Sequence, residues 1–197
     1  MRTQPARKKG DAFSDSVYSR VLDIATKGGL AVPASYCRVY REKGYPANMR
    51  KGDIHLDVSI EIWAPNAPRW SMLWAFECKD YARTVPVTAL ETFSAHLNQV
   101  APFNRKGIMV TKSAYSSEAL EFANNSGMAL VRILPDDQVE FVMFRGTPTG
   151  NGYGHSADFA DALADPDYTG LNQSFFASYG GSYFSEWKTL LSGMAHS

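Results

Sequence analysis

The sequence predicts a mixed α/β fold, because hydrophobic residues recur with the period of a helix in some stretches and of a strand in others. The clearest strand is Ile54–Trp63, in which apolar and polar residues alternate. Two short and almost wholly apolar runs, 107–111 and 128–133, are typical of buried central strands. The 197 residues are 45% hydrophobic and 20% charged, which fits one globular domain, or one domain with a modest appendage.

The first half of the chain predicts a helix followed by a strand hairpin. Apolar residues at helical spacing predict a helix from Ala12 to about Lys27, ended by two glycines. A short strand is expected at 36–40 and a loop at 44–52. A proline-containing loop joins the strand at 54–63 to a second strand at 70–79, so the two strands are expected to form an antiparallel hairpin.

The second half predicts alternating helices and strands that lead into an aromatic-rich segment. The expected elements are a helix at 85–100, a strand at 107–111, a helix at 118–125, a strand at 128–133 and an edge strand at 138–144. We expect residues 1–11 to be a disordered basic tail, 12–145 the main domain, and 146–197 a linker with a C-terminal extension. The extension, with short helices at 157–163 and 184–192, is expected to pack on the main domain or on a partner.

Composition and charge narrow the class of protein. No run of about 18 apolar residues occurs, so no membrane span is expected, and the basic N-terminus lacks the apolar stretch of a signal peptide. The two cysteines are far apart and form no zinc-type spacing, and a reducing, cytoplasmic setting is expected. The formal net charge is zero, but basic residues are in excess over residues 1–53. That segment is either a contact for a phosphate backbone or a solvated tail.

One pair of charged residues in the second hairpin strand requires an explanation. Glu77 and Lys79 share one face of a strand that is otherwise apolar. A buried carboxylate and ammonium cost several kcal/mol unless they are paired or bind a metal. A hairpin that pairs residue 61 with about 73 also puts Asp57 opposite Glu77, about 5 Å away.

Two carboxylates that converge on one point are the ligands that a hard divalent cation needs. The backbone carbonyl of Cys78 is a candidate third oxygen ligand, and Lys79 beside the cation would hold a water molecule and stabilise charge on a phosphate. The alternative is an ion pair of Lys79 with Glu77 or Asp57 on a solvated sheet face. The cysteine side chain points to the opposite face and is expected to be a small core residue rather than a nucleophile.

Asp57 together with Glu77-Cys78-Lys79-Asp80-Tyr81 resembles the PD-(D/E)xK nuclease signature, and the order of elements resembles the Mrr-like restriction endonuclease family. The family's order is a strand with Asp, a strand ending in E-C-K, a helix, a strand ending in G-(I/V)-x-V-T and a helix with small residues. The corresponding parts here are 56–58, 76–79, 86–100, 106–111 and 117–123. The resemblance covers about residues 12–134. It implies a restriction-endonuclease-like core, with a mixed central sheet flanked by helices and a small C-terminal extension.

The resemblance also implies roles for particular residues. Asp57 and Glu77 match the metal-binding acids, and Lys79 matches the catalytic lysine. Gln99 lies late on the following helix, near where many relatives carry a functional glutamine; an exposed polar helix residue is the alternative. Many relatives carry a further acid on the first helix, and Asp15 lies one position away from the expected place, so its part in the metal site stays open.

The function that these features imply is a Mg²⁺-dependent endonuclease, with Mn²⁺ as a possible substitute, that hydrolyses DNA phosphodiester bonds. The resemblance implies a role in restriction, defence or repair. Because cleavage of both strands usually needs two active sites, a homodimer is expected, with the aromatic extension as a candidate interface. The alternative from another class is a nucleic-acid-binding or interaction protein whose nuclease-like domain is inactive.

Overall fold

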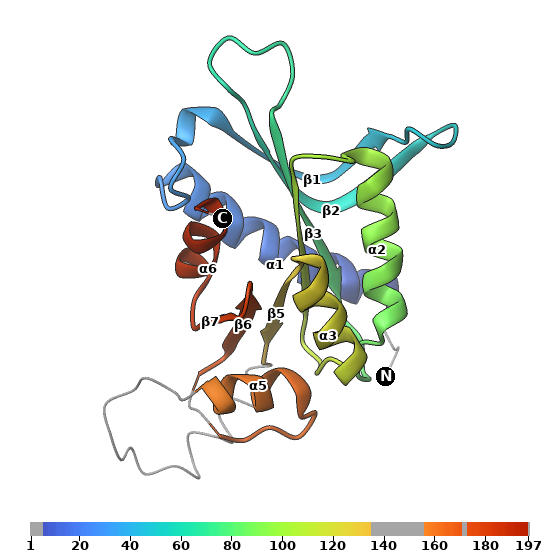
Figure 1. Cartoon of the computed structure of the whole chain (residues 1–197), viewed down its shortest axis with the longest axis vertical. Helices are drawn as coiled ribbons and strands as arrows, with labels where there is room; N and C mark the ends of the chain where they lie inside the picture. Colours follow the sequence, from blue (N-terminus) through green and yellow to red (C-terminus); the bar gives the residue numbers. More distant parts are fainter. Residues whose placement is uncertain (1–5, 135–155, 171–172, 197) are drawn as a thin grey trace.

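The computed structural model describes residues 6–134, 156–170 and 173–196. Its centre is a seven-stranded sheet in which the strands lie side by side in the order of the sequence (Figure 1). The strands are β1 Cys37–Pro46, β2 Asp53–Ile62, β3 Met72–Lys79, β4 Arg105–Thr111, β5 Ala129–Ile133, β6 Phe175–Tyr179 and β7 Ser182–Phe184. The pairs at both edges are antiparallel, whereas β3, β4 and β5 run parallel, so the sheet is mixed.

Helices cover both faces of the sheet and bury a separate apolar cluster on each. One face is covered by α2 Val87–Val100, α3 Ser117–Ser126 and α5 Ser156–Ala164, and the other by α1 Ala6–Thr26 and α6 Trp187–Ala195. Alternate residues of β3 divide between the two clusters: Leu73 and Ala75 face α2, while Trp74 and Phe76 face α1. All four are fully buried. The prediction of an α/β fold with a mixed sheet flanked by helices is therefore confirmed.

Local sequence signals explain where the third helix begins and ends. The Ser116 side chain accepts a hydrogen bond from the backbone N–H of Ala119 (3.2 Å), which is the usual arrangement of an N-cap. Gly127 ends the helix in the left-handed conformation with φ +66°, a region that glycine enters without a Cβ clash. These two caps set the ends of α3, the helix that connects the parallel strands β4 and β5.

The beginning of the chain differs from the prediction in two places. Helix α1 begins at Ala6, inside the segment 1–11 that was expected to be a disordered tail. Strand β1 runs from Cys37 to Pro46, where a short strand and a loop were expected, because its ladder with β2 continues as far as the pair Pro46↔Asp53. Cross-strand pairing therefore stabilises a strand whose own hydrophobic pattern is weak.

The C-terminal extension packs on the main domain, one of the two expected outcomes, and its strands join the sheet. The hairpin β6–β7 was not predicted, and it extends the sheet because β6 pairs antiparallel with β5. Buried Arg132 on β5 joins this segment to the core, since its guanidinium donates to the carbonyl oxygens of Ala162 (2.7 Å) and Asp165 (2.6 Å). The predicted strand at 138–144 and linker at 146–154 lie outside the described residues.

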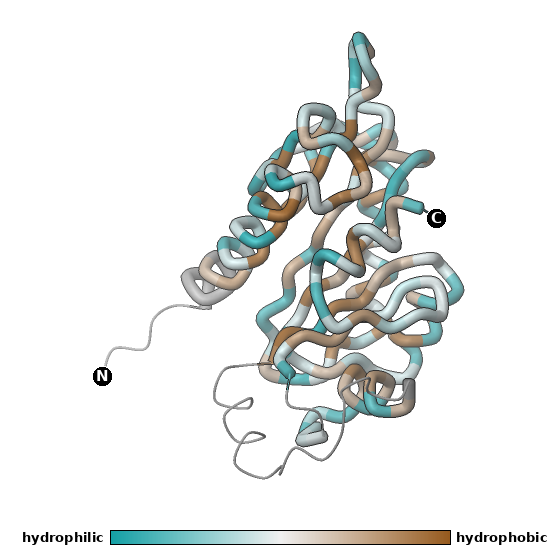
Figure 2. Tube along the Cα trace, turned by 90° about the vertical axis from the view of Figure 1, so that its left-hand side faces the viewer, coloured by the Kyte–Doolittle hydropathy of each residue, from teal (hydrophilic) through white to brown (hydrophobic). Residues whose placement is uncertain are grey.

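The aromatic side chains at the C-terminal end mostly pack in the core, as expected. Phe159, Tyr168 and Phe176 are buried, and the ring of Phe176 contacts the other two edge to face, with centroids 5.6 and 5.3 Å apart. Figure 2 shows the hydrophobic stretches in the interior of the molecule and a hydrophilic tip on the long loop between β2 and β3. No helix among the residues described is long and apolar enough to cross a membrane.

Candidate active site

The hairpin of β2 and β3 has the register that the sequence predicts. Glu61 pairs with Leu73 and Val58 pairs with Phe76, so one further step brings Asp57 beside Glu77. The backbone N–H of Cys78 donates to the Asp57 carboxylate at 2.7 Å, and this bond fixes the side chain at the end of β3. The two acids thus come from neighbouring strands in the middle of the sheet.

Strand β2 is distorted where Asp57 lies. The ladder between β1 and β2 skips Asp57 and Glu42, and Glu42 has the left-handed φ of +48°. The two neighbours of Asp57 in β2 then pack on opposite faces, Leu56 in the cluster under α2 and Val58 in the cluster under α1. Left-handed backbone at a residue that is not glycine is uncommon and costly, and it is found more often at functional sites. The sequence carried no signal for Glu42.

Glu77 and Lys79 form an ion pair with the Lys79 Nζ and the Glu77 Oε1 2.5 Å apart. Their side chains are 17% and 27% exposed, so the pair is largely removed from solvent rather than lying on an open sheet face. The Glu77–Lys79 ion pair, which was the alternative to a metal site, is therefore present, but it is more buried than a pair on a solvated sheet face. Asp57 lies close enough to both groups to interact with them electrostatically.

Burial and the charges around Asp57 shift the pKa of its carboxyl group. Burial and the negative charge of Glu77 raise the pKa of Asp57 to about 6, although the Cys78 N–H bond and Lys79 favour the ionised form. Glu42 adds a smaller repulsion. Burial opposes the charged form of Lys79, but the charge and hydrogen bond of Glu77, together with smaller effects of Tyr81 and Asp57, outweigh burial and raise the lysine pKa. Lys79 therefore does not fully neutralise the two carboxylates of Asp57 and Glu77.

The Cys78 side chain is partly buried on the face of β3 opposite to Glu77 and Lys79. Burial raises the pKa of its thiol well above the ordinary value, and the carboxylates of Asp57 and Glu77 raise it further. A thiol in that state is a poor nucleophile. Its side chain packs against the cluster under α1, as the sequence predicts for a core residue.

A cleft of about 650 Å³ opens beyond the carboxyl ends of β3 and β4. Asp80 and Tyr81, which follow Lys79, line one part of it, and Lys112, which follows the end of β4, lines another. Lys112 donates to the Asp80 carboxylate at 3.2 Å. Exposed Arg83 adds a further positive charge. The cleft thus begins directly after the end of β3, the strand that carries Glu77 and Lys79, although neither side chain lines it.

Two other predicted site residues lie apart from the acids. Gln99 is in the last turn of α2, whereas Glu77 lies near the beginning of that crossover helix. The backbone carbonyl oxygen of Gln99 accepts from the backbone N–H of Asn48 (2.9 Å). Asp15 on α1 forms an ion pair with Arg41 at 2.6 Å and is 53% exposed. The structure brings neither side chain to the pair of Asp57 and Glu77.

A cation would thus find two carboxylates here rather than a larger cluster. Within the described parts of the chain, no group of three or more His, Cys, Asp or Glu side chains is arranged to hold a metal. The donor set still suits a hard cation, because two facing carboxylates that repel each other lose that repulsion when a positive charge lies between them.

A mixed sheet with helices on both faces and an acidic pair and a lysine on adjoining strands is the architecture of restriction-endonuclease-like proteins. The family described as restriction endonuclease (Mrr_cat) matches residues 33–135, more than half of the chain. The protein belongs to this family. The match begins after α1 and ends after β5, so α1 and the C-terminal strands lie outside it.

Similar solved structures were also found. One is a protein of unknown function, 14% identical over 63% of this chain and 76% of that chain, with a TM-score of 0.39. Another is a repair endonuclease from Pyrococcus abyssi, 16% identical over 68% of this chain and 50% of that chain, with a TM-score of 0.37. No curated protein matches the sequence.

Proposed function

We propose that this protein is a metal-dependent endonuclease that hydrolyses DNA phosphodiester bonds, with Asp57, Glu77 and Lys79 as its active site. The observation that carries the proposal is the placement of Asp57 beside Glu77, with the pKa of Asp57 raised to about 6. Membership in the restriction endonuclease family supports it. Roles in restriction, defence or repair, and assembly as a homodimer, belong to the same proposal.

Mg²⁺, or Mn²⁺ in its place, fits the donors at this point of the sheet. The Asp57 and Glu77 carboxylates would hold it, with the Cys78 backbone carbonyl as a third oxygen ligand. When bound, such a cation polarises the scissile phosphodiester and lowers the pKa of the attacking water. Both carboxylates are now engaged by protein donors, Glu77 by Lys79 and Asp57 by the Cys78 N–H.

Lys79 contributes the positive charge that the reaction needs on the protein side. Its side chain is 27% exposed, and its ammonium lies 6.0 Å from the ring centroid of Tyr81, which lines the cleft beyond β3. There it donates to a phosphate oxygen and stabilises the charge that develops as the bond breaks. The raised pKa of Lys79 keeps the group protonated at neutral pH. Lys112 and Arg83 line the same cleft and would position the DNA backbone.

A second candidate function is a nucleic-acid-binding protein with an inactive nuclease-like domain. The observation that favours it is that Lys79 already forms an ion pair with Glu77, while Asp15 pairs with Arg41 instead of joining the two acids. The two functions differ in one measurable property. An inactive domain binds DNA without cutting it under any metal.

The test is cleavage of supercoiled and linear DNA in Mg²⁺, Mn²⁺ and EDTA. The native chain is compared with Glu77→Gln and Lys79→Met, and with Glu118→Gln as a matched control, since Glu118 is a fully exposed acid on α3. We expect metal-dependent nicking that the two site variants lose and the control keeps. Binding without cutting in every metal would overturn the enzyme in favour of the binding module.

A further inference from the structure

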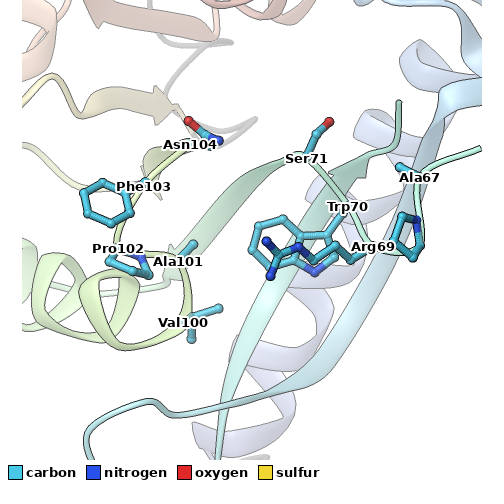
Figure 3. A pocket seen from close by; sticks show the side chains of 10 residues that line it. Ala67, Arg69, Trp70, Ser71, Val100, Ala101, Pro102, Phe103 and Asn104 are labelled. Carbon is cyan, nitrogen blue, oxygen red and sulfur yellow. The ribbon is translucent and has the colours of Figure 1, made fainter. Parts of the chain in front are cut away.

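A second cleft, of about 640 Å³, lies at the opposite end of β3 and β4 from the acidic pair (Figure 3). It is formed by the loop between β2 and β3 on one side and by the segment that joins α2 to β4 on the other. Trp70 and Arg69 stand on the first side, and Pro102 and Phe103 on the second. This volume lies within the range of ordinary small-ligand sites, about 300 to 1,000 Å³.

The chemistry of the lining suits a flat aromatic ring joined to an anion. Trp70 is half-buried against the core, while Phe103 is 80% exposed, a large apolar ring that the fold leaves in solvent. Arg69 is exposed, and no acid within the described residues lies at ion-pairing distance from it. Ser71 and Asn104 supply hydrogen-bonding groups along one edge (Figure 3).

The walls of this cleft are held in place by hydrogen bonds of the surrounding backbone. Asn104 has the left-handed φ of +53°, and its carbonyl oxygen accepts from the N–H of Leu73 (3.0 Å). The Arg105 guanidinium donates to the carbonyl oxygens of Ala101 (2.8 Å) and Pro102 (2.5 Å), just before Phe103. The backbone that carries the lining side chains is thus held in place, which lowers the entropic cost of binding.

Positive charge continues from the cleft to the neighbouring hairpin tip between β1 and β2. Asn48 in that tip donates from its backbone N–H to Gln99 (2.9 Å) and from its side-chain amide to Asn98 (3.3 Å), so the tip rests on the last turn of α2. Arg50 and Lys51 are exposed on the same tip. Arginine and lysine beside an exposed aromatic ring are the combination that binds single-stranded nucleic acid.

We infer that the cleft between Trp70 and Phe103 binds an unstacked nucleotide: the base stacks on the exposed ring of Phe103, and its phosphate pairs with Arg69. Glu77 follows Trp70 by seven residues along β3 and the segment before it, so the cleft lies about 23 Å from the acidic pair, or about seven base pairs of duplex. The inference rests on the proposed nuclease function in one respect only, that the nucleotide belongs to a substrate strand. Such a substrate carries an unpaired base or single strand near the cut.

The experiment measures binding without cleavage, in EDTA. The probe is a single-stranded oligothymidine with one 2-aminopurine, whose fluorescence changes when the base stacks, and free dAMP is titrated in a separate arm. Phe103→Leu removes the ring but keeps an apolar group, whereas Phe103→Tyr keeps the ring. Because Phe103 is exposed, neither change disturbs the core. Tyr183→Leu on β7 is the matched control for an exposed ring elsewhere.

We expect Phe103→Leu and Arg69→Gln to weaken binding of the oligonucleotide by about tenfold, the order of one stacked base or one phosphate contact. Phe103→Tyr and Tyr183→Leu should bind like the native chain. Tighter binding of the oligonucleotide than of dAMP identifies a nucleic-acid strand as the ligand, and equal binding identifies a free nucleotide.

Equal affinities of Phe103→Leu and Phe103→Tyr overturn the inference. So does a change in self-association of Phe103→Leu with no change in oligonucleotide binding, since the cleft is then a protein interface. Because this assay contains no metal, loss of nucleotide binding with intact cleavage refutes only the cleft. Intact nucleotide binding without any cleavage refutes only the nuclease.

Discussion

Strands β3 and β4 run parallel through the centre of the sheet, and their two ends are chemically unlike. At the carboxyl ends, Glu77, Lys79 and Lys112 are charged, partly buried and engaged in ion pairs within the protein. At the amino ends, Trp70 and Phe103 line a cleft that is largely apolar. Charges withdrawn from water must have partners even before a substrate arrives, whereas an exposed ring costs little and can be left open. The carboxyl ends are therefore the candidate site of catalysis, and the amino ends are the candidate site of substrate recognition.

The largest effect should follow a change at the charged end. Glu77→Gln and Lys79→Met each remove one member of the ion pair, and we expect DNA cleavage in Mg²⁺ to fall about 100-fold or more, the usual effect of losing one group that stabilises the transition state. Initial rates of plasmid nicking measure it, with circular dichroism to check folding. A residual rate within about threefold of the native chain would exclude both residues from the chemistry.

Cation binding should also appear as stability. If Mg²⁺ binds between Asp57 and Glu77, a concentration 100 times the dissociation constant raises the unfolding free energy by about 2.7 kcal/mol. Thermal unfolding in MgCl₂ is compared with EDTA and NaCl at equal ionic strength. Glu77→Gln should lose most of the rise, and Glu118→Gln should keep it. A rise of the same size in Glu77→Gln would mean that the ion binds elsewhere.

The raised pKa of Asp57 predicts a third, smaller effect on stability. Its pKa is about 6 in the folded chain against an ordinary value of 3.8, so the folded state holds the proton more tightly and is destabilised as the pH rises from about 4 to 6. Two pKa units correspond to at most about 2 to 3 kcal/mol, and partial exposure makes about 2 the better expectation. Asp57→Asn removes this cost, and its amide oxygen can still accept from the Cys78 N–H.

Urea unfolding in EDTA at several pH values measures the difference. Asp57→Asn should be more stable than the native chain at pH 7.5, should lose this advantage below about pH 4, and should not cleave DNA. An advantage of the same size at pH 4 and pH 7.5 would show that charge is not its cause. A variant that is more stable yet inactive would show that this end of the sheet trades stability for function.

The sequence predicted the parts of this comparison that depend on strong local patterns. The length of the loop after β2 predicted the hairpin register, which brings Asp57 to Glu77. Two features depend on contacts between distant segments and could not be predicted in the same way. Glu42 becomes left-handed only where β1 meets the distortion in β2, and β6 becomes a strand because β5 offers it an edge.

The amino end of β3 and β4 was missed for a related reason. Trp70 and Phe103 are more than 30 positions apart, and each stands in a loop without periodicity. Only the parallel pairing of β3 with β4, which sets Leu73 beside Arg105, brings the two loops together. At the other end of the two strands, the same parallel pairing makes Lys79 and Thr111 partners.

Phe103→Leu should have the smallest effect on stability and on the cleavage of fully paired DNA, because Phe103 belongs to the end of the strands assigned to recognition. Its side chain is 80% exposed, so the unfolding free energy should change by less than about 0.5 kcal/mol, and nicking of fully paired DNA should equal that of the native chain. Cleavage of DNA with an unpaired stretch about seven base pairs from the cut should fall, through a higher KM and an unchanged kcat, because only binding is weakened. A lower kcat on fully paired DNA would show instead that the two ends of β3 and β4 are coupled, and the division between chemistry and recognition would have to be withdrawn.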